Sequence, residues 1–357
     1  MKNYDIIHFE AMGAESSHLD EETRAAIAAG KLPQDLRYLI VQDTVQEFLA
    51  KNPEEELPDL ITIKTHSKFP DGYLDGKKKS IITRSAGYDH VEMFADRANI
   101  TSLRNYCVNA VAETGIKLMY CACGLLNEYG KNAATFERNK TRSFMELNED
   151  RIVTVFGVGK IGKRVHDLCK GNGLTVQAVD VRAEELDKLY HGEVKFVSKE
   201  EALATSDIII NVMNLTRIPE SKLYNVGYFS EEVLRKAKPG LVFINVTRGE
   251  IAPETGILKL YKEGHLYGFG TDVFSNEAAF SNLVKFGTPT DDPNVLAGKE
   301  LLDMSLAHTE NVYTQAHQAF NSDVAASNKA HDAIEHMIAW YAAGGEKFDE
   351  QLPYYQA

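Results

Sequence analysis

Three charged residues in the second half of the chain are of the types that acid–base chemistry on a small organic anion requires. Arg248 follows the apolar run from Leu241 to Val246, Glu277 lies five residues beyond Asp272, and His308 is one of eleven histidines. A guanidinium grips a carboxylate through two parallel hydrogen bonds and polarises a nearby carbonyl, while an imidazole exchanges a proton. Each residue alone is equally typical of a surface or loop position. Together they form the set that reduction of a 2-oxo acid needs.

A glycine-rich turn gives the second chemical signal. The run Gly157-Val158-Gly159-Lys160-Ile161-Gly162 follows the apolar run from Ile152 to Phe156 and opens a predicted helix that continues to about Lys170. In this context G-x-G-x-x-G is typical of dinucleotide binding, because its glycines permit a tight turn, close approach of a pyrophosphate and close helix packing. The phosphates are expected at the positive end of the helix, near the amides of Lys160 and Ile161.

An acidic residue follows the second strand of the same predicted unit. Asp180 stands eighteen residues beyond Gly162, where a carboxylate accepts hydrogen bonds from the ribose hydroxyls of NAD and repels the 2′-phosphate of NADP. Arg182 lies two residues further on, and an arginine near this position can bind the 2′-phosphate of NADP. Because the aspartate occupies the strand end itself, the sequence favours NAD.

The pattern of apolar runs places these motifs in two α/β domains. Strand-like runs alternate with helical stretches such as Asp43 to Lys51 in the N-terminal part, which indicates a parallel sheet. A long apolar helix from Val108 to Leu126 is the predicted junction. After it, continuous apolar runs predict a doubly wound sheet, and its strands are expected at Ile152–Phe156, Val176–Val179, Val194–Val197, Ile208–Val212, Leu241–Val246 and Leu266–Phe269. A last helix is predicted over Val324 to Ala342.

Composition excludes several classes of protein. The chain has 357 residues and a formal net charge of −13, which opposes binding to nucleic acids and to anionic membranes. It contains no apolar run long enough for a membrane span and no signal-peptide pattern at its start, so we expect a cytoplasmic protein. Cys121 and Cys123 are two residues apart on a predicted helix and make a poor ligand pair, and we expect no metal site.

The motifs and their order resemble the D-isomer-specific 2-hydroxyacid dehydrogenase family, especially its D-lactate dehydrogenase-like branch. The run from Thr83 to Asp89 is similar to the family loop whose backbone amides receive the substrate carboxylate, which implies that role for Ala86 and Gly87. The run from Tyr106 to Glu113 is similar to the family's Tyr-Ser-Pro-Asn-Ala-(Ile/Val)-Ala-Glu, which implies that Tyr106 lines the substrate pocket.

The same resemblance implies roles for the charged residues. Arg248 would orient the substrate, His308 would transfer the proton, and Glu277 would partner the imidazole. The family's Thr-Pro-His is matched here to Leu306-Ala307-His308, without the proline. Further cofactor contacts are implied for Val212, Met213, Val246, Thr247 and Asp272, the last of these near the nicotinamide.

The resemblance also implies an organisation. A discontinuous substrate domain would comprise residues 1–108 and 312–357, with an NAD-binding Rossmann domain at 109–311 between them. The active site would lie in the cleft between two Rossmann-like parallel-sheet domains. A homodimer is the family expectation.

Two other functions remain compatible with the sequence. A formate or phosphite dehydrogenase on the same scaffold would turn over NAD without a 2-hydroxy acid, although Glu277 argues against formate because the formate enzymes use glutamine there. An NADH-sensing protein that resembles the C-terminal-binding-protein corepressors would bind NADH and reduce no 2-oxo acid.

Overall fold

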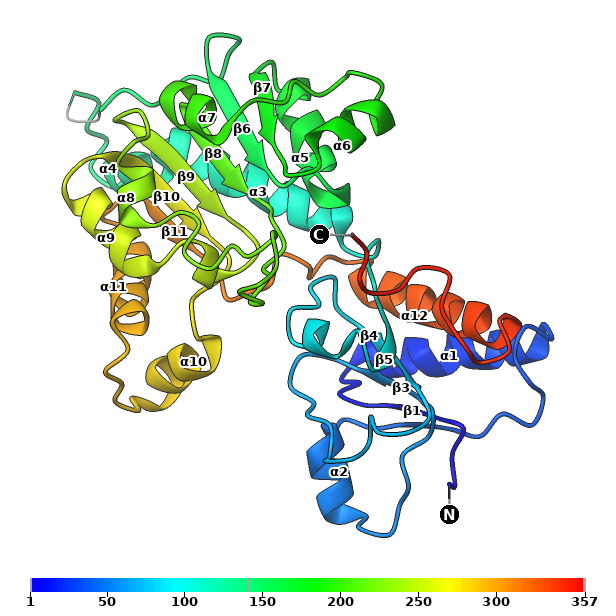
Figure 1. Ribbon diagram of the computed structural model, residues 1–357. Helices are drawn as coiled ribbons and strands as arrows, with labels where there is room; N and C mark the ends of the chain where they lie inside the picture. The colour runs from blue at the N-terminus through cyan, green and yellow to red at the C-terminus, as the bar shows by residue number, and fades with distance from the viewer. Residues whose placement is uncertain (1, 140–141, 356–357) are drawn as a thin grey trace. The chain divides into compact units, whose positions relative to one another are not determined.

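The computed structural model describes residues 2–139 and 142–355, which form two compact units (Figure 1). Unit 1 comprises residues 1–107 and 321–357, and unit 2 comprises residues 108–320. Each unit contains its own parallel sheet with helices packed against it, as the alternating sequence pattern predicted.

Unit 1 is built on a five-stranded parallel sheet in the order β2-β1-β3-β4-β5. Its strands are β1 (Ile6–His8), β2 (Tyr38–Ile40), β3 (Leu60–Ile63), β4 (Lys79–Thr83) and β5 (Ala98–Ser102). The helices are α1 (Ala14–Ala28), α2 (Val45–Lys51), α12 (Ala325–Ala342) and the short 3-10 turn η1 (Glu92–Phe94). Helix α12 lies along α1, so the two ends of the chain build one layer of this unit.

Unit 2 is built on a six-stranded parallel sheet in the order β11-β10-β9-β8-β6-β7. Its strands are β6 (Ile152–Phe156), β7 (Thr175–Val179), β8 (Ile208–Asn211), β9 (Leu241–Asn245), β10 (Leu266–Thr271) and β11 (Val312–Thr314). The helices are α3 (Val108–Cys123), α4 (Leu126–Ala133), α5 (Lys160–Gly171), α6 (Ala183–Leu189), α7 (Lys199–Thr205), α8 (Glu231–Leu234), α9 (Glu254–Lys262), α10 (Glu277–Phe286) and α11 (Pro293–Ala307), with a 3-10 turn η2 (Gly249–Ile251). The order of strands reverses between β6 and β8, which is where a doubly wound sheet binds its ligand.

Two glycines of β10 set how closely helix α3 packs on the sheet of unit 2. A Cβ atom at Gly268 would lie 3.1 Å from Ala122 Cβ, and one at Gly270 would lie 2.9 Å from Leu118 Cβ and 2.8 Å from Ile244 Cδ1. Only a strand without side chains on that face lets the helix come so near. The helix in turn buries its apolar face on the strands.

The structure corrects the predicted elements in two places and shows two helices in a stretch for which no element was predicted. The expected single helix from Val108 to Leu126 is broken after Cys123, because Leu125 adopts a left-handed conformation with φ 51° and starts α4. The run Val194–Val197 forms an isolated bridge between Phe196 and Ala178 and no strand of its own. The stretch from Ala278 to Asp303, which the sequence left unassigned, forms most of α10 and α11.

The boundary of unit 2 was also predicted too early. Strand β11 pairs with β10 through Phe269↔Val312 and Thr271↔Thr314, so the residues from 312 to 320 belong to unit 2. The predicted start of the second substrate-domain segment at 312 is wrong for this reason. The chain leaves unit 2 at Phe320.

No helix in residues 2–139 and 142–355 combines the length and apolar character that a membrane crossing requires.

Replacing Gly270 by alanine should destabilise unit 2. The added methyl group would overlap Leu118 and Ile244, and overpacking of this kind lowers the free energy of unfolding by about 1–3 kcal/mol. Urea unfolding followed by circular dichroism measures the change. Gly130→Ala in α4 is the matched control, because its new Cβ meets no atom within 4 Å, and it should be neutral or stabilise by up to about 1 kcal/mol. Equal effects of the two substitutions would contradict the packing argument.

Candidate functional site

The glycine-rich turn joins β6 to α5 in the geometry that a pyrophosphate needs. Gly157 has φ 84°, and a Cβ there would lie 2.8 Å from Met213 Cα. A Cβ at Gly162 would lie only 1.9 Å from the carbonyl oxygen of Gly157. Gly159 is the N-cap of α5, so the amides of Lys160 and Ile161 begin the helix. A backbone cradle that side chains would fill, placed at a helix N-terminus, fits a dinucleotide phosphate.

Asp180 lies directly against this turn. It follows β7, and its Oδ2 accepts a hydrogen bond of 2.7 Å from the amide of Val158. Its Oδ1 accepts from the amide of Arg182 at 2.9 Å, and the guanidinium of Arg182 is paired with Glu185 at 3.1 Å. The carboxylate is thus fixed at the strand end where the adenosine ribose is expected, and the guanidinium of Arg182 is shared between Glu185 and Asp180, whose Oδ1 lies 4.0 Å from Arg182 Nε.

The other predicted cofactor residues gather at the same edge of the sheet. Val212 and Met213 follow β8 and pack on the glycine turn, where they are the atoms that a Cβ at Gly162 or at Gly157 would meet. Val246 and Thr247 follow β9, and Thr247 Oγ1 accepts from Asn211 Nδ2 at 3.2 Å. The carboxyl ends of β6, β7, β8 and β9 therefore bring the predicted residues together as the parallel topology requires.

The acid–imidazole pair expected at this edge involves a different histidine. Glu277 opens α10, and its Oε2 lies 2.8 Å from Nδ1 of His317. The predicted pairing of Glu277 with His308 is wrong. Because a carboxylate accepts hydrogen bonds, Nδ1 of His317 is the donor, which leaves Nε2 for proton exchange.

His308 lies at the opposite edge of the sheet. It caps the C-terminus of α11, is exposed, and its Nδ1 contacts Asn127 Oδ1 at 3.1 Å. It precedes β11, whereas His317 follows β11 on the side where β10 delivers Asp272 and Glu277. In a parallel sheet the two ends of one strand belong to opposite edges, so His308 cannot join Arg248 and Glu277.

A signal for His317 was present in the sequence. The run Asn311-Val312-Tyr313-Thr314 is a short strand followed directly by Gln315-Ala316-His317, and the family's Thr-Pro-His can be matched there as well as at His308. The strand has only three residues, and it lacks an apolar run comparable with those of β8 or β9. Because this strand was not predicted, the sequence did not place His317 at the carboxyl end of a strand.

Asp272 holds the segment that carries His317. Its side chain is fully buried and accepts from the amides of Gln318 at 2.9 Å and Ala319 at 2.8 Å, and from Gln315 Nε2 at 3.2 Å. Its backbone oxygen accepts from the amide of His317 at 2.6 Å. Burial raises the pKa of Asp272, and the two amide hydrogen bonds partly offset that shift. The predicted cofactor residue is therefore also the anchor of the candidate catalytic histidine.

Arg248 lies beside the loop that carries Glu277. The residue after it, Gly249, packs so closely on the backbone between Phe274 and Ser275 that a Cβ there would lie 2.1 Å from both Phe274 C and Ser275 N. Arg248 itself is extended, with its carbonyl accepting from Asn245 Nδ2 at 3.0 Å. The loops after β9 and β10 therefore bring the predicted cation and acid to neighbouring positions.

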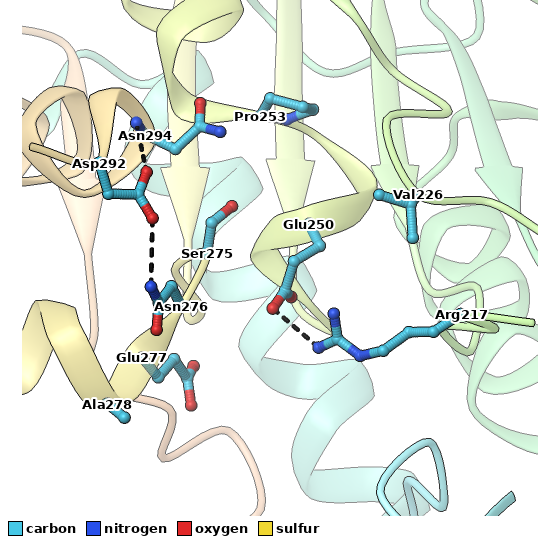
Figure 2. Close-up of a pocket in the computed structure, with 10 residues that line it drawn as sticks. All are labelled: Arg217, Val226, Glu250, Pro253, Ser275, Asn276, Glu277, Ala278, Asp292 and Asn294. Carbon is cyan, nitrogen blue, oxygen red and sulfur yellow. Dashed lines mark hydrogen bonds and ion pairs between the residues drawn. The ribbon is translucent and has the colours of Figure 1, made fainter. Parts of the chain in front are cut away.

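A cavity of about 540 Å³ opens on unit 2 next to Glu277 (Figure 2). One wall carries the ion pair between Arg217 and Glu250, with an N–O distance of 2.8 Å. Its lining combines the segments after β8, β9 and β10 with the starts of α10 and α11, and comprises Arg217, Val226, Glu250, Pro253, Ser275, Asn276, Glu277, Ala278, Asp292 and Asn294.

A buried acid supports the loop before Glu277, whose Ser275 lines this cavity. Glu254 is 3% exposed, and its Oε1 accepts from the amide of Ser275 at 2.6 Å. Its Oε2 has no hydrogen-bond partner among the described residues. Burial raises the pKa of Glu254 to about 7, against the opposing effect of the hydrogen bonds from Ser275.

Unit 1 places the predicted substrate residues on a tied loop after β4. Ser85 Oγ donates to the carbonyl of Gly87 at 2.6 Å and lies 3.0 Å from Thr83 Oγ1. The backbone N–H groups of Ala86 and Gly87 have no acceptor in the part of the chain that the structure describes. Tyr106 is buried, with its ring 4.9 Å from Lys329 Nζ.

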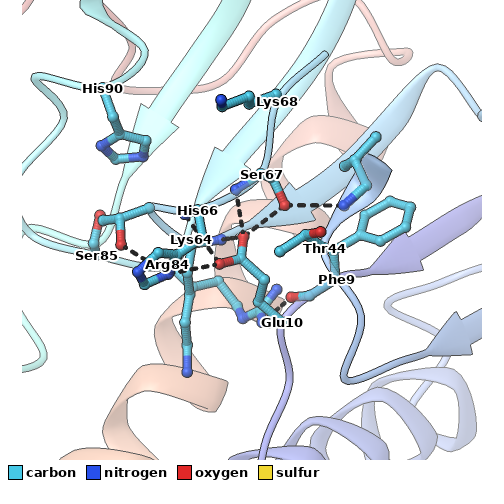
Figure 3. Close-up of polar contacts among 12 residues, drawn as sticks. Phe9, Glu10, Thr44, Lys64, His66, Ser67, Lys68, Arg84, Ser85 and His90 are labelled. Carbon is cyan, nitrogen blue, oxygen red and sulfur yellow. Dashed lines mark hydrogen bonds and ion pairs between the residues drawn. The ribbon is translucent and has the colours of Figure 1, made fainter. Parts of the chain in front are cut away.

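A buried carboxylate organises the neighbouring loop after β3 (Figure 3). Glu10 accepts from the amides of Lys64, His66 and Ser67 at 2.9, 3.1 and 3.2 Å, and from Ser67 Oγ at 2.6 Å. Sequence reasoning did not single out Glu10. Its neighbours in the fold come from residues more than fifty positions away.

Comparison with known proteins identifies relatives of this arrangement. Residues 117–319 match the family model described as "D-isomer specific 2-hydroxyacid dehydrogenase, NAD binding domain". A 2-hydroxyacid dehydrogenase homolog of Zymomonas mobilis is 30% identical over 72% of this chain and 74% of its own. A D-lactate dehydrogenase of Lactiplantibacillus plantarum is 26% identical over 77% of this chain and 79% of its own. The solved D-lactate dehydrogenase of Aquifex aeolicus, complexed with NAD and lactic acid, superposes with a TM-score of 0.74 at 19% identity and covers 99% of this chain and 100% of that one.

Glu254 should make stability depend on pH. Its pKa is about 7 in the folded protein and 4.5 ordinarily, so folding takes up a proton, and the free energy of unfolding falls as the pH rises from about 4.5 to 7. Glu254→Gln should remove this fall and be more stable than the parent at pH 8 by about 1–3 kcal/mol. Urea unfolding at pH 5 and pH 8 measures it. Glu263→Gln, on an exposed acid at the end of the same helix, is the control. An unchanged pH dependence in Glu254→Gln would contradict the assignment.

Proposed function

The chain belongs to the D-isomer-specific 2-hydroxyacid dehydrogenase family, and on that basis we propose that it reversibly reduces a small 2-oxo acid to the D-2-hydroxy acid with NADH. The observation that carries the proposal is the pair of His317 and Glu277, at 2.8 Å, at the strand edge that also bears Arg248. This combination of a proton donor, its carboxylate partner and a carboxylate-binding cation is what the reaction requires.

The glycine turn and Asp180 are the proposed cofactor site. Gly157, Gly159 and Gly162 would leave room for the pyrophosphate, and the amides of Lys160 and Ile161 at the start of α5 would donate to it. Asp180 would accept the ribose hydroxyls, with Val212, Met213, Val246 and Thr247 lining the rest of the site. When bound, NADH supplies the hydride that adds to the carbonyl carbon.

His317 is the proposed general acid in the direction of reduction. Its Nδ1–H donates to Glu277, which fixes the tautomer and the ring orientation, so Nε2–H can protonate the developing alkoxide oxygen. In the reverse direction, Nε2 accepts the proton of the hydroxyl group. Asp272 is a positioning residue in this scheme, because it accepts hydrogen bonds from the amides of His317 itself and of the two residues that follow it.

Arg248 and, in unit 1, the loop after β4 are the groups proposed to bind the substrate carboxylate. The guanidinium supplies two parallel donors and polarises the carbonyl oxygen. The N–H groups of Ala86 and Gly87, which Ser85 holds in a fixed turn, supply further donors to the carboxylate. Tyr106 is proposed to contact the substrate.

Replacing His317 tests the assignment of the proton donor. His317→Ala should lower kcat with pyruvate or 4-methyl-2-oxopentanoate by about 10²–10⁴-fold, because general acid catalysis contributes on that order. The Kd of NADH, measured by fluorescence titration, should stay within about threefold, since no cofactor contact is assigned to this residue. His308→Ala is the matched control and should retain nearly full kcat. The opposite outcome, with His308→Ala inactive and His317→Ala active, would reject the corrected site.

Replacing Asp180 tests the choice of cofactor. Asp180→Asn keeps an acceptor for the amide of Val158 but removes the charge that repels a 2′-phosphate. The ratio of kcat/KM for NADH over NADPH should fall by at least about tenfold, which corresponds to a loss of about 1.4 kcal/mol of discrimination. Asp187→Asn, on the exposed side of α6, should leave the ratio unchanged. A parent enzyme that already prefers NADPH would contradict the assignment directly.

A further inference from the structure

The loop that precedes Glu277 is supported by a buried side chain that the proposed reaction does not use. We call residues 274–276, the last three before α10, the 274–276 loop. Glu254 is the first residue of α9, and its Oε1 accepts a hydrogen bond of 2.6 Å from the amide of Ser275 in this loop. Both residues belong to unit 2, so this support is internal to one compact unit.

The 274–276 loop sets the position of the Glu277 carboxylate. Glu277 follows the loop directly, and its Oε1 accepts from the amide of Phe274 at 3.5 Å, while its Oε2 lies 2.8 Å from Nδ1 of His317. Asn276 has a left-handed backbone conformation with φ 48°, which is uncommon for residues other than glycine and needs supporting contacts. A shift of this loop would therefore move the carboxylate relative to the imidazole.

The same loop borders the cavity of about 540 Å³ on unit 2. Ser275, Asn276 and Glu277 all line it, and Asn276 Nδ2 donates to Asp292 Oδ2 at 3.1 Å across its rim (Figure 2). A cavity offers no close-packed atoms to resist a small displacement of the residues that line it. The hydrogen bonds to Asp292 and Glu254 are therefore what hold the loop against movement in that direction.

Glu254 is well suited to hold the loop because its own side chain is tightly packed. It is 3% exposed, and it lies beside helix α11. A Cβ at Gly298 of α11 would lie 3.5 Å from Glu254 Cγ and 3.1 Å from Phe274 Cδ1, so this helix packs on both the glutamate and the loop. Phe274 also stacks on Phe280 of α10, with ring centroids 4.0 Å apart. A side chain fixed in this way can in turn fix the group that it binds.

Stability alone does not explain a carboxyl group at this position. Burial raises the pKa of Glu254 to about 7, and its Oε2 has no hydrogen-bond partner among the described residues. A glutamine would offer an acceptor to Ser275 without a buried charge, and burial of an unpaired charge is unfavourable. The carboxyl group supplies a stronger hydrogen bond when it is ionised, because a charged acceptor binds an amide more tightly than a neutral one.

We propose that Glu254 is a positioning residue for the proton transfer, which holds the 274–276 loop through the amide of Ser275 and so keeps Glu277 against His317. This inference rests on the proposed function. The effect of Glu254 reaches the reaction through Glu277. Its loss should therefore lower kcat and leave KM and the Kd of NADH nearly unchanged.

Replacing Glu254 tests the proposal in the full-length enzyme with NADH at pH 7. Glu254→Leu removes the acceptor and keeps a side chain of similar size. We expect kcat with pyruvate or 4-methyl-2-oxopentanoate to fall by at least about tenfold, because a small misplacement of a catalytic group costs up to about 100-fold. Glu254→Gln keeps an acceptor for Ser275 and should retain kcat within about threefold. Glu263→Leu, the same substitution on an exposed acid at the other end of α9, should retain it within about twofold.

A double substitution distinguishes positioning from a purely structural role. Glu277→Ala removes the carboxylate through which Glu254 is proposed to act. In that background Glu254→Leu should lower kcat by no more than about twofold further, because residues that act as one unit are not additive. An unchanged kcat in Glu254→Leu alone would overturn the proposal. So would a loss in the Glu277→Ala background as large as in the parent, or a rise in KM without a fall in kcat.

Circular dichroism and urea unfolding verify that Glu254→Leu folds. If it does not, Glu254→Asp is compared in the same way, because its side chain is one methylene shorter and draws the acceptor away from the amide of Ser275.

A spectroscopic measurement separates failure of this inference from failure of the proposed function. The ring nitrogens of His317 are observed by NMR in protein labelled with ¹⁵N-histidine, and their signals are identified by their absence in His317→Ala. At pH 9 the neutral imidazole should carry its proton on Nδ1 in the parent and in Glu254→Gln, and mainly on Nε2 in Glu254→Leu, because the hydrogen bond to Glu277 selects the tautomer.

The two failures then differ in their results. An enzyme that reduces no 2-oxo acid but shows this change of tautomer would reject the proposed reaction and keep the positioning role of Glu254. A proton that stays on Nδ1 in all three proteins would reject the positioning role, whatever the enzyme reduces.

Discussion

The buried carboxylate of Asp272 is the interaction on which the candidate active edge of unit 2 depends. It accepts hydrogen bonds from the amides of Gln318 and Ala319, and its backbone oxygen accepts from the amide of His317. His317 itself has φ 50°, a left-handed conformation that is unfavourable by roughly 1–2 kcal/mol for a residue with a side chain. The surrounding hydrogen bonds must compensate for that strain. One buried acid thereby sets the position of the imidazole against Glu277.

The parts of the site that local sequence determines were predictable. A G-x-G-x-x-G run after a buried strand predicts the observed turn. A side chain at Gly162 would collide with the carbonyl oxygen of Gly157, and a side chain at Gly157 would collide with Met213. Asp180 could be located because one helix and one strand separate it from the glycine turn. Arg248 and Glu277 follow from the rule that ligands gather at the carboxyl ends of parallel strands, and both lie there.

The histidine and the buried charges around Glu15 in unit 1 were beyond local reasoning, for a common physical reason. Strand β11 has three residues and owes its existence to pairing with β10, so no local pattern assigned His317 to an edge, and His308 remained an equal choice. Glu15, Lys64, Arg84 and Lys329 come together through parallel pairing of β3 with β4 and through packing of α12 on α1. Neither contact leaves a periodic pattern in the chain. Nothing in the sequence distinguishes these charged residues from exposed ones, and only the fold shows that they are buried.

The discontinuity of unit 1 has a consequence for how the protein is made. Trp340 of α12 donates to Ser80 Oγ at 2.8 Å, and the amide of Leu352 donates to the carbonyl of Ile100 at 2.8 Å. Both contacts join the last part of the chain to strands that are synthesised first. Unit 2, in contrast, is one continuous segment from residue 108 to 320. During translation we expect unit 2 to fold before α12 has been synthesised. Unit 1, whose strands are synthesised before unit 2, would therefore complete its folding after unit 2.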